Sequence, residues 1–246
     1  MFISSSSAEI LIGLVNMNCV VTTNFSPNKA PFENPKVLKP IKGWDYFIFS
    51  NIEEIVKEEI FNGWRVMPRD LISNHPIYTA KYYKYHIHKE LPNYSKAIYV
   101  DAWLNPNSDK DWDRLEEPFY LKKHQKRDCI FQELRAIAKF ARDTKQNMDK
   151  VKDFLESQSF PKNYGLWETQ IQLRCLKNKK VNKICEDLYN LMKNYSYRDQ
   201  SLLSYVLWKN NFTPNDEVLS NRWRTEVSRS VARKTKFVSG NKRIYN

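Results

Sequence analysis

Three acids of this sequence stand where predicted elements begin or end, namely Asp101, Glu168 and Asp199. A carboxylate in such a place can hold a divalent cation that neutralises a diphosphate leaving group. It can also accept the proton of an attacking hydroxyl group, or stabilise a sugar that becomes cationic in the transition state. Glycosyl transfer needs a set of this kind, so the three acids are the first candidates for a functional site.

Asp101 follows the unbroken apolar run of residues 97–100. A short apolar run predicts a strand that is buried on both faces. In an α/β sheet the residue after such a strand lies at the carboxyl edge, where open sheets bind ligands. Asp101 is therefore predicted to face a ligand, and the alternative is that it only begins the surface turn of residues 101–106.

A helix predicted over residues 77–91 leads into this strand and carries a basic stripe. Lys81, Lys84 and His88 recur at i, i+3 and i+7, which places them along one side of a helix. The side that faces the core is formed by Ala80, Tyr83, Ile87 and Leu91. Two interpretations are open: the stripe lies at the sheet edge and meets a diphosphate, or it is a solvated face.

The other two acids have local interpretations as well. Glu168 lies in the predicted loop of residues 163–169, which leads into a strand. Ser196 and Asp199 fit the S-x-x-D capping box that starts a helix. On the pattern alone the cap is the better interpretation of Asp199, although a helix start at a sheet edge can serve both purposes.

The elements that must position these residues predict an α/β fold. Apolar runs are separated by loops and helices rather than by hairpin turns, which indicates a mixed, mostly parallel central sheet flanked by helices. The predicted strands cover residues 18–23, 44–51, 64–67, 96–100, 119–121 and 171–176. Residues 1–210 are assigned to this single domain and residues 211–246 to a basic C-terminal extension.

The formal net charge of +12 calls for an anionic partner. A nucleotide phosphate, a nucleic acid or an acidic membrane surface would each satisfy it. Much of the excess lies in the C-terminal extension, so the alternative hypothesis is a non-catalytic protein that binds nucleic acid or another polyanion there.

Several other classes are disfavoured by missing patterns. The chain has no G-x-x-x-x-G-K-[ST] or G-x-G-x-x-G phosphate loop, no G-x-S-x-G elbow and no H-E-x-x-H. Its four cysteines show no zinc-binding spacing. No apolar run approaches the roughly 20 residues of a membrane span. We expect a cytoplasmic protein without an integral membrane span.

The stretch from about Cys19 to Trp208 resembles a glycosyltransferase-like family first catalogued as a domain of unknown function. That family is best known from plant proteins tied to pectin and seed mucilage, and it has bacterial and viral members. The matching blocks follow the family's order: Val20–Thr23, Asp45–Phe49, Gly63–Val66, Lys81–His88, Leu91–Tyr94, Ile98–Asp101, His124, Arg127–Phe131, Glu133, Phe160–Pro161, Gly165–Thr169, Tyr195–Gln200 and Tyr205–Lys209.

The resemblance implies a GT-A type fold that holds a sugar nucleotide, most readily a UDP-sugar, at the sheet edge. Asp101 would belong to a D-x-D-like motif and hold Mn²⁺ or Mg²⁺. Glu168 and Asp199 would face the transferred sugar and the acceptor glycan, with Asp199 as the base if the enzyme inverts. The predicted contacts to the nucleotide sugar are Thr22, Thr23, Lys81, Lys84, His88, Asp101 and Arg198.

The chain departs from the family pattern at two places. Trp103 stands where the family has Asn or Asp after its acid, which removes a second metal ligand. Ser50 and Asn51 replace a Thr-Asp pair after the second strand. A degenerate transferase that binds a sugar nucleotide without turnover is a further interpretation.

Overall fold

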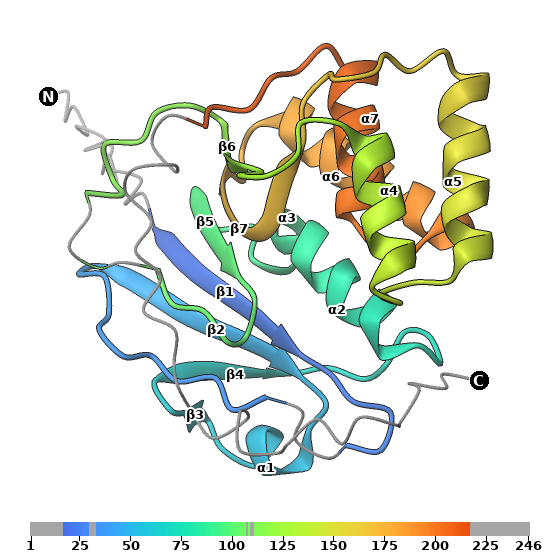
Figure 1. The fold of residues 1–246 in the computed structure, drawn as a ribbon. Helices are drawn as coiled ribbons and strands as arrows, with labels where there is room; N and C mark the ends of the chain where they lie inside the picture. Colours follow the sequence, from blue (N-terminus) through green and yellow to red (C-terminus); the bar gives the residue numbers. More distant parts are fainter. Residues whose placement is uncertain (1–16, 30–32, 107, 109–110, 217–246) are drawn as a thin grey trace, which may run out of the picture.

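The computed structural model describes residues 17–29, 33–106, 108 and 111–216, which form a single α/β domain. At its centre is a seven-stranded sheet with the order β3-β4-β2-β1-β5-β7-β6 (Figure 1). The strands are β1 (Asn18–Asn24), β2 (Trp44–Ser50), β3 (Ile60–Phe61), β4 (Trp64–Pro68), β5 (Lys96–Val100), β6 (Phe119–Lys123) and β7 (Trp167–Cys175). The predicted α/β class and mixed sheet are confirmed. Three pairings are parallel and three antiparallel, so the sheet is only partly parallel.

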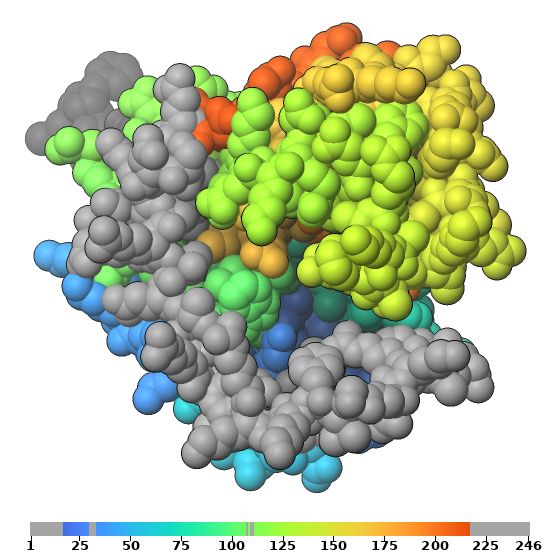
Figure 2. Space-filling model, in the orientation of Figure 1, coloured from blue at the N-terminus to red at the C-terminus, as the bar shows by residue number. Residues whose placement is uncertain are grey.

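Helices flank the sheet. Those of the described ranges are α1 (Glu53–Val56), α2 (Pro76–Tyr85), α3 (Ile87–Glu90), α4 (Ile130–Lys139), α5 (Lys145–Ser157), α6 (Lys179–Tyr195) and α7 (Gln200–Lys209). Figure 1 shows α4 to α7 gathered on one side of the molecule, and in Figure 2 the side chains of α4 and α5 form the outer surface there. Each of these helices is too short or too polar to span a lipid bilayer.

The central strands β1, β2 and β5 contain continuous apolar runs because both faces of the sheet are covered. Successive residues of a strand point to opposite faces. Val21 of β1 joins a buried cluster with Tyr83 and Ile87 from α2 and α3. Val20 joins a second cluster with Trp112, which lies in the segment between β5 and β6. Burial on both faces explains why these strands appear in the sequence as runs rather than as alternating patterns.

Two predictions about local structure were wrong. The helix predicted over residues 77–91 is broken at His86, whose φ of −110° and ψ of 24° end α2 and leave α3 as a separate turn. Glu168 lies inside β7 rather than in a loop, because that strand starts at Trp167. The short elements α1 and β3 were not predicted.

The predicted capping role of Asp199 is confirmed, but the Ser196–Asp199 capping box is absent. Ser196 ends α6, and its hydroxyl accepts a hydrogen bond from the Arg198 amide at 3.0 Å. Asp199 itself caps α7, because its carboxylate accepts from the Gln200 amide at 3.0 Å. The pattern thus identified Asp199 as a capping residue but gave Ser196 the N-cap position that Asp199 itself occupies.

The packed chain continues beyond residue 210. The amide of Asn215 donates to the Phe119 carbonyl at 3.1 Å, and the Leu121 amide donates to the Asn215 carbonyl at 3.2 Å. This segment therefore adds to the edge strand β6. Most of the predicted basic extension, residues 217–246, lies outside the described residues.

Candidate functional site

The order of the strands reverses between β1 and β5. The chain runs from β1 outward through β2 to β4, and then returns to place β5 on the other side of β1. Ladder pairing of β1 with β5 ends at Val21 and Tyr99. Open α/β sheets bind ligands outside the strand ends at such a reversal. The topology therefore places a candidate site between the end of β1 and Asp101, which directly follows β5.

A pocket opens at this point. It is lined by the end of β1 with the loop behind it, by the first turns of α2 and by the residues after β5. Its polar and aromatic lining residues are Thr23, Asn24, Phe25, Ser26, Glu33, Lys81, Tyr99, Asp101 and Trp103. Of the predicted site residues, Thr23, Lys81 and Asp101 thus share one pocket. Thr22 is fully buried beside it, and its hydroxyl joins the two strands by donating to the Val100 carbonyl at 2.9 Å.

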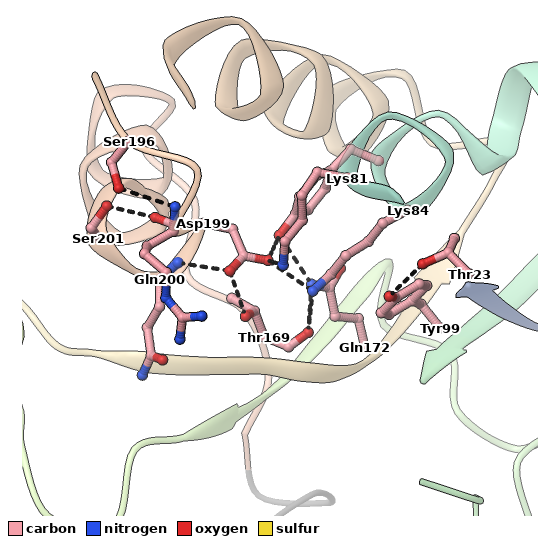
Figure 3. Close-up of polar contacts among 12 residues, drawn as sticks. Thr23, Lys81, Lys84, Tyr99, Thr169, Gln172, Ser196, Asp199, Gln200 and Ser201 are labelled. Carbon is pink, nitrogen blue, oxygen red and sulfur yellow. Dashed lines mark hydrogen bonds and ion pairs between the residues drawn. The ribbon is translucent and has the colours of Figure 1, made fainter. Parts of the chain in front are cut away.

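Asp199 is buried at the centre of an ionic cluster, which Figure 3 shows. Its Oδ2 atom accepts hydrogen bonds from Lys81 Nζ at 2.5 Å, from Lys84 Nζ at 2.8 Å and from the Tyr85 hydroxyl at 2.7 Å. Its Oδ1 atom accepts from the Thr169 hydroxyl and the Gln200 amide, each at 3.0 Å. Burial acts to raise the pKa of Asp199, but the charges of Lys81 and Lys84 together hold that pKa well below its usual range. The carboxylate is therefore ionised and fully engaged.

The two lysines of α2 differ in environment although they are three residues apart. The Lys81 side chain lines the pocket and is 17% exposed. The Lys84 side chain is 0% exposed, and its Nζ also donates to the Thr169 carbonyl at 2.6 Å. Burial lowers the pKa of Lys84 to about 8, although the charge of Asp199 acts to raise it. Lys84 therefore belongs to the interior, and a solvated basic face is the wrong description of it.

The structure does not bring His88, Arg198 and Glu168 into this pocket. His88 lies in α3, beyond the helix break, with its Nε2 atom 3.0 Å from Glu186 Oε1. Arg198 Nε is buried and has no hydrogen-bond partner among the described residues. Glu168 Oε2 lies 2.9 Å from Lys122 Nζ. Because Glu168 precedes Thr169 in β7, its side chain points away from the Asp199 cluster.

Sequence reasoning missed two members of the cluster, Tyr85 and Thr169. Burial raises the pKa of Tyr85 well above its usual value, and the charge of Asp199 raises it further, so the hydroxyl keeps its proton and donates it. Tyr85 stands four residues after Lys81, on the same side of α2, and this spacing is the signal that could have found it. No local sequence pattern indicates that Thr169 contacts Asp199, and the sequence had assigned Thr169 to a loop.

The pocket has two carboxylates that suit a divalent cation, the predicted Asp101 and Glu33, which the sequence did not single out. Across the described ranges, no group of three or more His, Cys, Asp or Glu side chains could hold a metal ion. Mg²⁺, however, is commonly held by one or two carboxylates together with substrate phosphates and water. Asp101 and Glu33 both line the pocket, and one or two carboxylates fit that manner of binding, in which a ligand completes the coordination.

Comparison with known proteins assigns no family to this chain. No protein-family model matches it, and no curated protein matches it. The resemblance to the glycosyltransferase-like family stays a prediction, and a functional proposal has to depend on the pocket.

Proposed function

We propose that this protein is a GT-A-like glycosyltransferase that moves a sugar from a nucleoside-diphosphate sugar, such as a UDP-sugar, to a hydroxyl group of a glycan or similar acceptor. One observation carries the proposal. The pocket at the reversal of strand order combines the Asp101 carboxylate, the Lys81 ammonium and the start of α2. The first turn of a helix carries partial positive charge that suits a phosphate. In α2 this attraction comes with few free amides, because Pro76 has no N–H and the Tyr78 amide donates to the His75 carbonyl. A diphosphate joined to a sugar supplies the matching anion.

The segments of the pocket suggest distinct roles. Thr23 and Asn24, at the end of β1, would contact the nucleoside, and the first turns of α2 would hold the diphosphate. Asp101 would hold the donor in place, together with a divalent cation. Such a cation, when bound, lowers the charge that develops on the leaving diphosphate.

The acceptor side needs a second acid. Glu168 does not line the donor pocket, and its carboxylate pairs with Lys122 at 2.9 Å, but it is partly exposed and has fewer partners than Asp199. Asp199 has five donors on its oxygens and a strongly lowered pKa, so it is a poor proton acceptor. Since the Asp101 amide bonds to the Gln170 carbonyl at 2.9 Å, Glu168 continues β7 past Asp101 at the same edge of the sheet.

We assign Glu168 as the base and Asp199 as a positioning residue. The acceptor oxygen attacks the anomeric carbon while its proton passes to the Glu168 carboxylate. The bond from that carbon to the diphosphate oxygen breaks, and its electron pair leaves with the nucleoside diphosphate.

The test is release of nucleoside diphosphate from a panel of donor sugars, with acceptor glycans, in Mn²⁺, in Mg²⁺ and in EDTA. We expect turnover of at least one donor and a loss of about 100-fold or more for Asp101→Asn and for Glu168→Gln. Asp149→Asn is the matched control, because that acid lies on the exposed face of α5, where it pairs with Lys145. Wild-type turnover by Asp101→Asn, or no turnover of any donor by the wild type, would contradict the proposal.

A further inference from the structure

We infer that Lys81 is an exchangeable cation: it is held by Asp199 in the unliganded pocket and passes to the phosphate of a bound ligand, while Lys84 stays behind as the fixed counter-charge of Asp199. The inference rests on the proposed function for the identity of the ligand. It gives separate tasks to two lysines that belong to one stripe of one helix.

The position of Lys81 gives its ammonium access to a ligand. Ile77, Ala80 and Lys81 all line the pocket from the first turns of α2. Lys84 lies one turn further along the helix and is sealed from solvent. A phosphate at the start of α2 therefore meets Lys81 and cannot reach Lys84.

Asp199 can release Lys81 without becoming an unpaired buried charge. The same Oδ2 atom also accepts from Lys84 and Tyr85, and Oδ1 is held by Thr169 and the Gln200 amide. Lys81 would exchange one charge-assisted hydrogen bond for another, to phosphate. Lys84 has no such freedom, because its ammonium is sealed from solvent, and its departure would remove the fully buried positive charge beside the carboxylate and leave the Thr169 carbonyl to the Gln172 side-chain amide at 3.2 Å.

The Tyr85 hydroxyl connects Asp199 to this exchange. It donates to the oxygen that Lys81 must leave. Without the hydroxyl, that oxygen depends more on Lys81, and the ammonium becomes harder to release. Tyr85 therefore acts on ligand affinity through Lys81 although it does not line the pocket. It is a positioning residue.

The experiment measures binding of inorganic pyrophosphate and of UDP in Mg²⁺ buffer by isothermal titration calorimetry. Lys81→Met is expected to weaken both several-fold, because the hydrogen bond lost to phosphate is offset in part by the Asp199 contact that the wild type gives up on binding. Lys89→Met is the matched control, because Lys89 pairs with Glu186 on the surface. This variant should bind both ligands with wild-type affinity.

A double-mutant cycle tests the exchange itself. Tyr85→Phe keeps the ring and should weaken binding several-fold when Lys81 is present, but leave binding unchanged when Lys81 has been replaced by Met. An equal effect of Tyr85→Phe in both backgrounds, or wild-type affinity of Lys81→Met, would overturn the inference and leave the proposed function intact. No binding of either ligand by the wild type would overturn both.

Discussion

Replacing Asp199 with Asn should destabilise the protein far more than loss of an ordinary ion pair. The amide has nearly the shape of the carboxylate but no charge, so the substitution leaves the cavity filled. Lys84 is 0% exposed and would lose its only carboxylate hydrogen-bond partner among the described residues. With Asp101 as the only negative charge of the described residues left to act on it, the buried ammonium has a desolvation cost that is largely uncompensated.

The size of the effect follows from this burial. Removing one partner of a buried ion pair costs about 3–5 kcal/mol. In a chain of this size, each kcal/mol lowers the melting temperature by about 2–4 °C, so a fall of roughly 6–20 °C is expected.

The stability of Asp199→Asn should also depend on pH in a predictable direction. Lys84 has a pKa of about 8 beside Asp199, against an ordinary value of 10.5. Loss of the carboxylate lowers that pKa further, so the folded variant binds fewer protons than its unfolded chain already below pH 8. Its stability should therefore rise with pH between about 6 and 8, where Lys84 in the wild type contributes little change.

The assay is thermal and urea unfolding of the wild type and Asp199→Asn at pH 6 and pH 8. Asp187→Asn is the matched control, because Asp187 pairs with Lys183 at 2.7 Å on the exposed face of α6. Exposed pairs of that kind contribute about 0–1 kcal/mol. The reasoning is refuted if Asp199→Asn costs no more than the control, or if its cost is the same at both pH values.

Two further predictions concern stability. Gly165→Ala places a Cβ atom 2.8 Å from the Trp167 ring at a φ of +120°, whereas Gly43→Ala meets nothing within 4 Å at a φ of +80°. Either substitution should lower the free energy of unfolding in urea by about 1–3 kcal/mol of backbone strain. Gly165→Ala should lower it further because of the contact with Trp167, and equal losses for the two variants would contradict this. Because the pKa of Asp199 is depressed from 3.8, its stabilisation is complete above about pH 4 and is lost as pH falls. The urea midpoints of the wild type and of Asp199→Asn should therefore approach each other as the pH is lowered toward 2. A difference between the midpoints that stays constant with pH would contradict this prediction.

The local elements could be predicted from the sequence because their signals are local. The apolar run of residues 97–100 forms β5, and Asp101 follows it at the edge of the sheet. The helical spacing of Tyr83, Ile87 and Leu91 identified residues that are buried. The break at His86 could not be seen, because a single residue that leaves helical geometry does not interrupt a periodic pattern.

The partners of these residues were decided only by the tertiary structure. The sequence placed Lys81 and Lys84 on one stripe of a helix, which is correct, but it could not say that one lines a pocket and the other is sealed. That difference comes from Asp199, 115 residues away from Lys84, and from Thr169 in β7. Periodicity determines which side of a helix a residue occupies. The segments that pack against that side are distant in the sequence. Here the Asp199 carboxylate packs against the basic stripe, so the two lysines form a buried ion cluster behind the pocket.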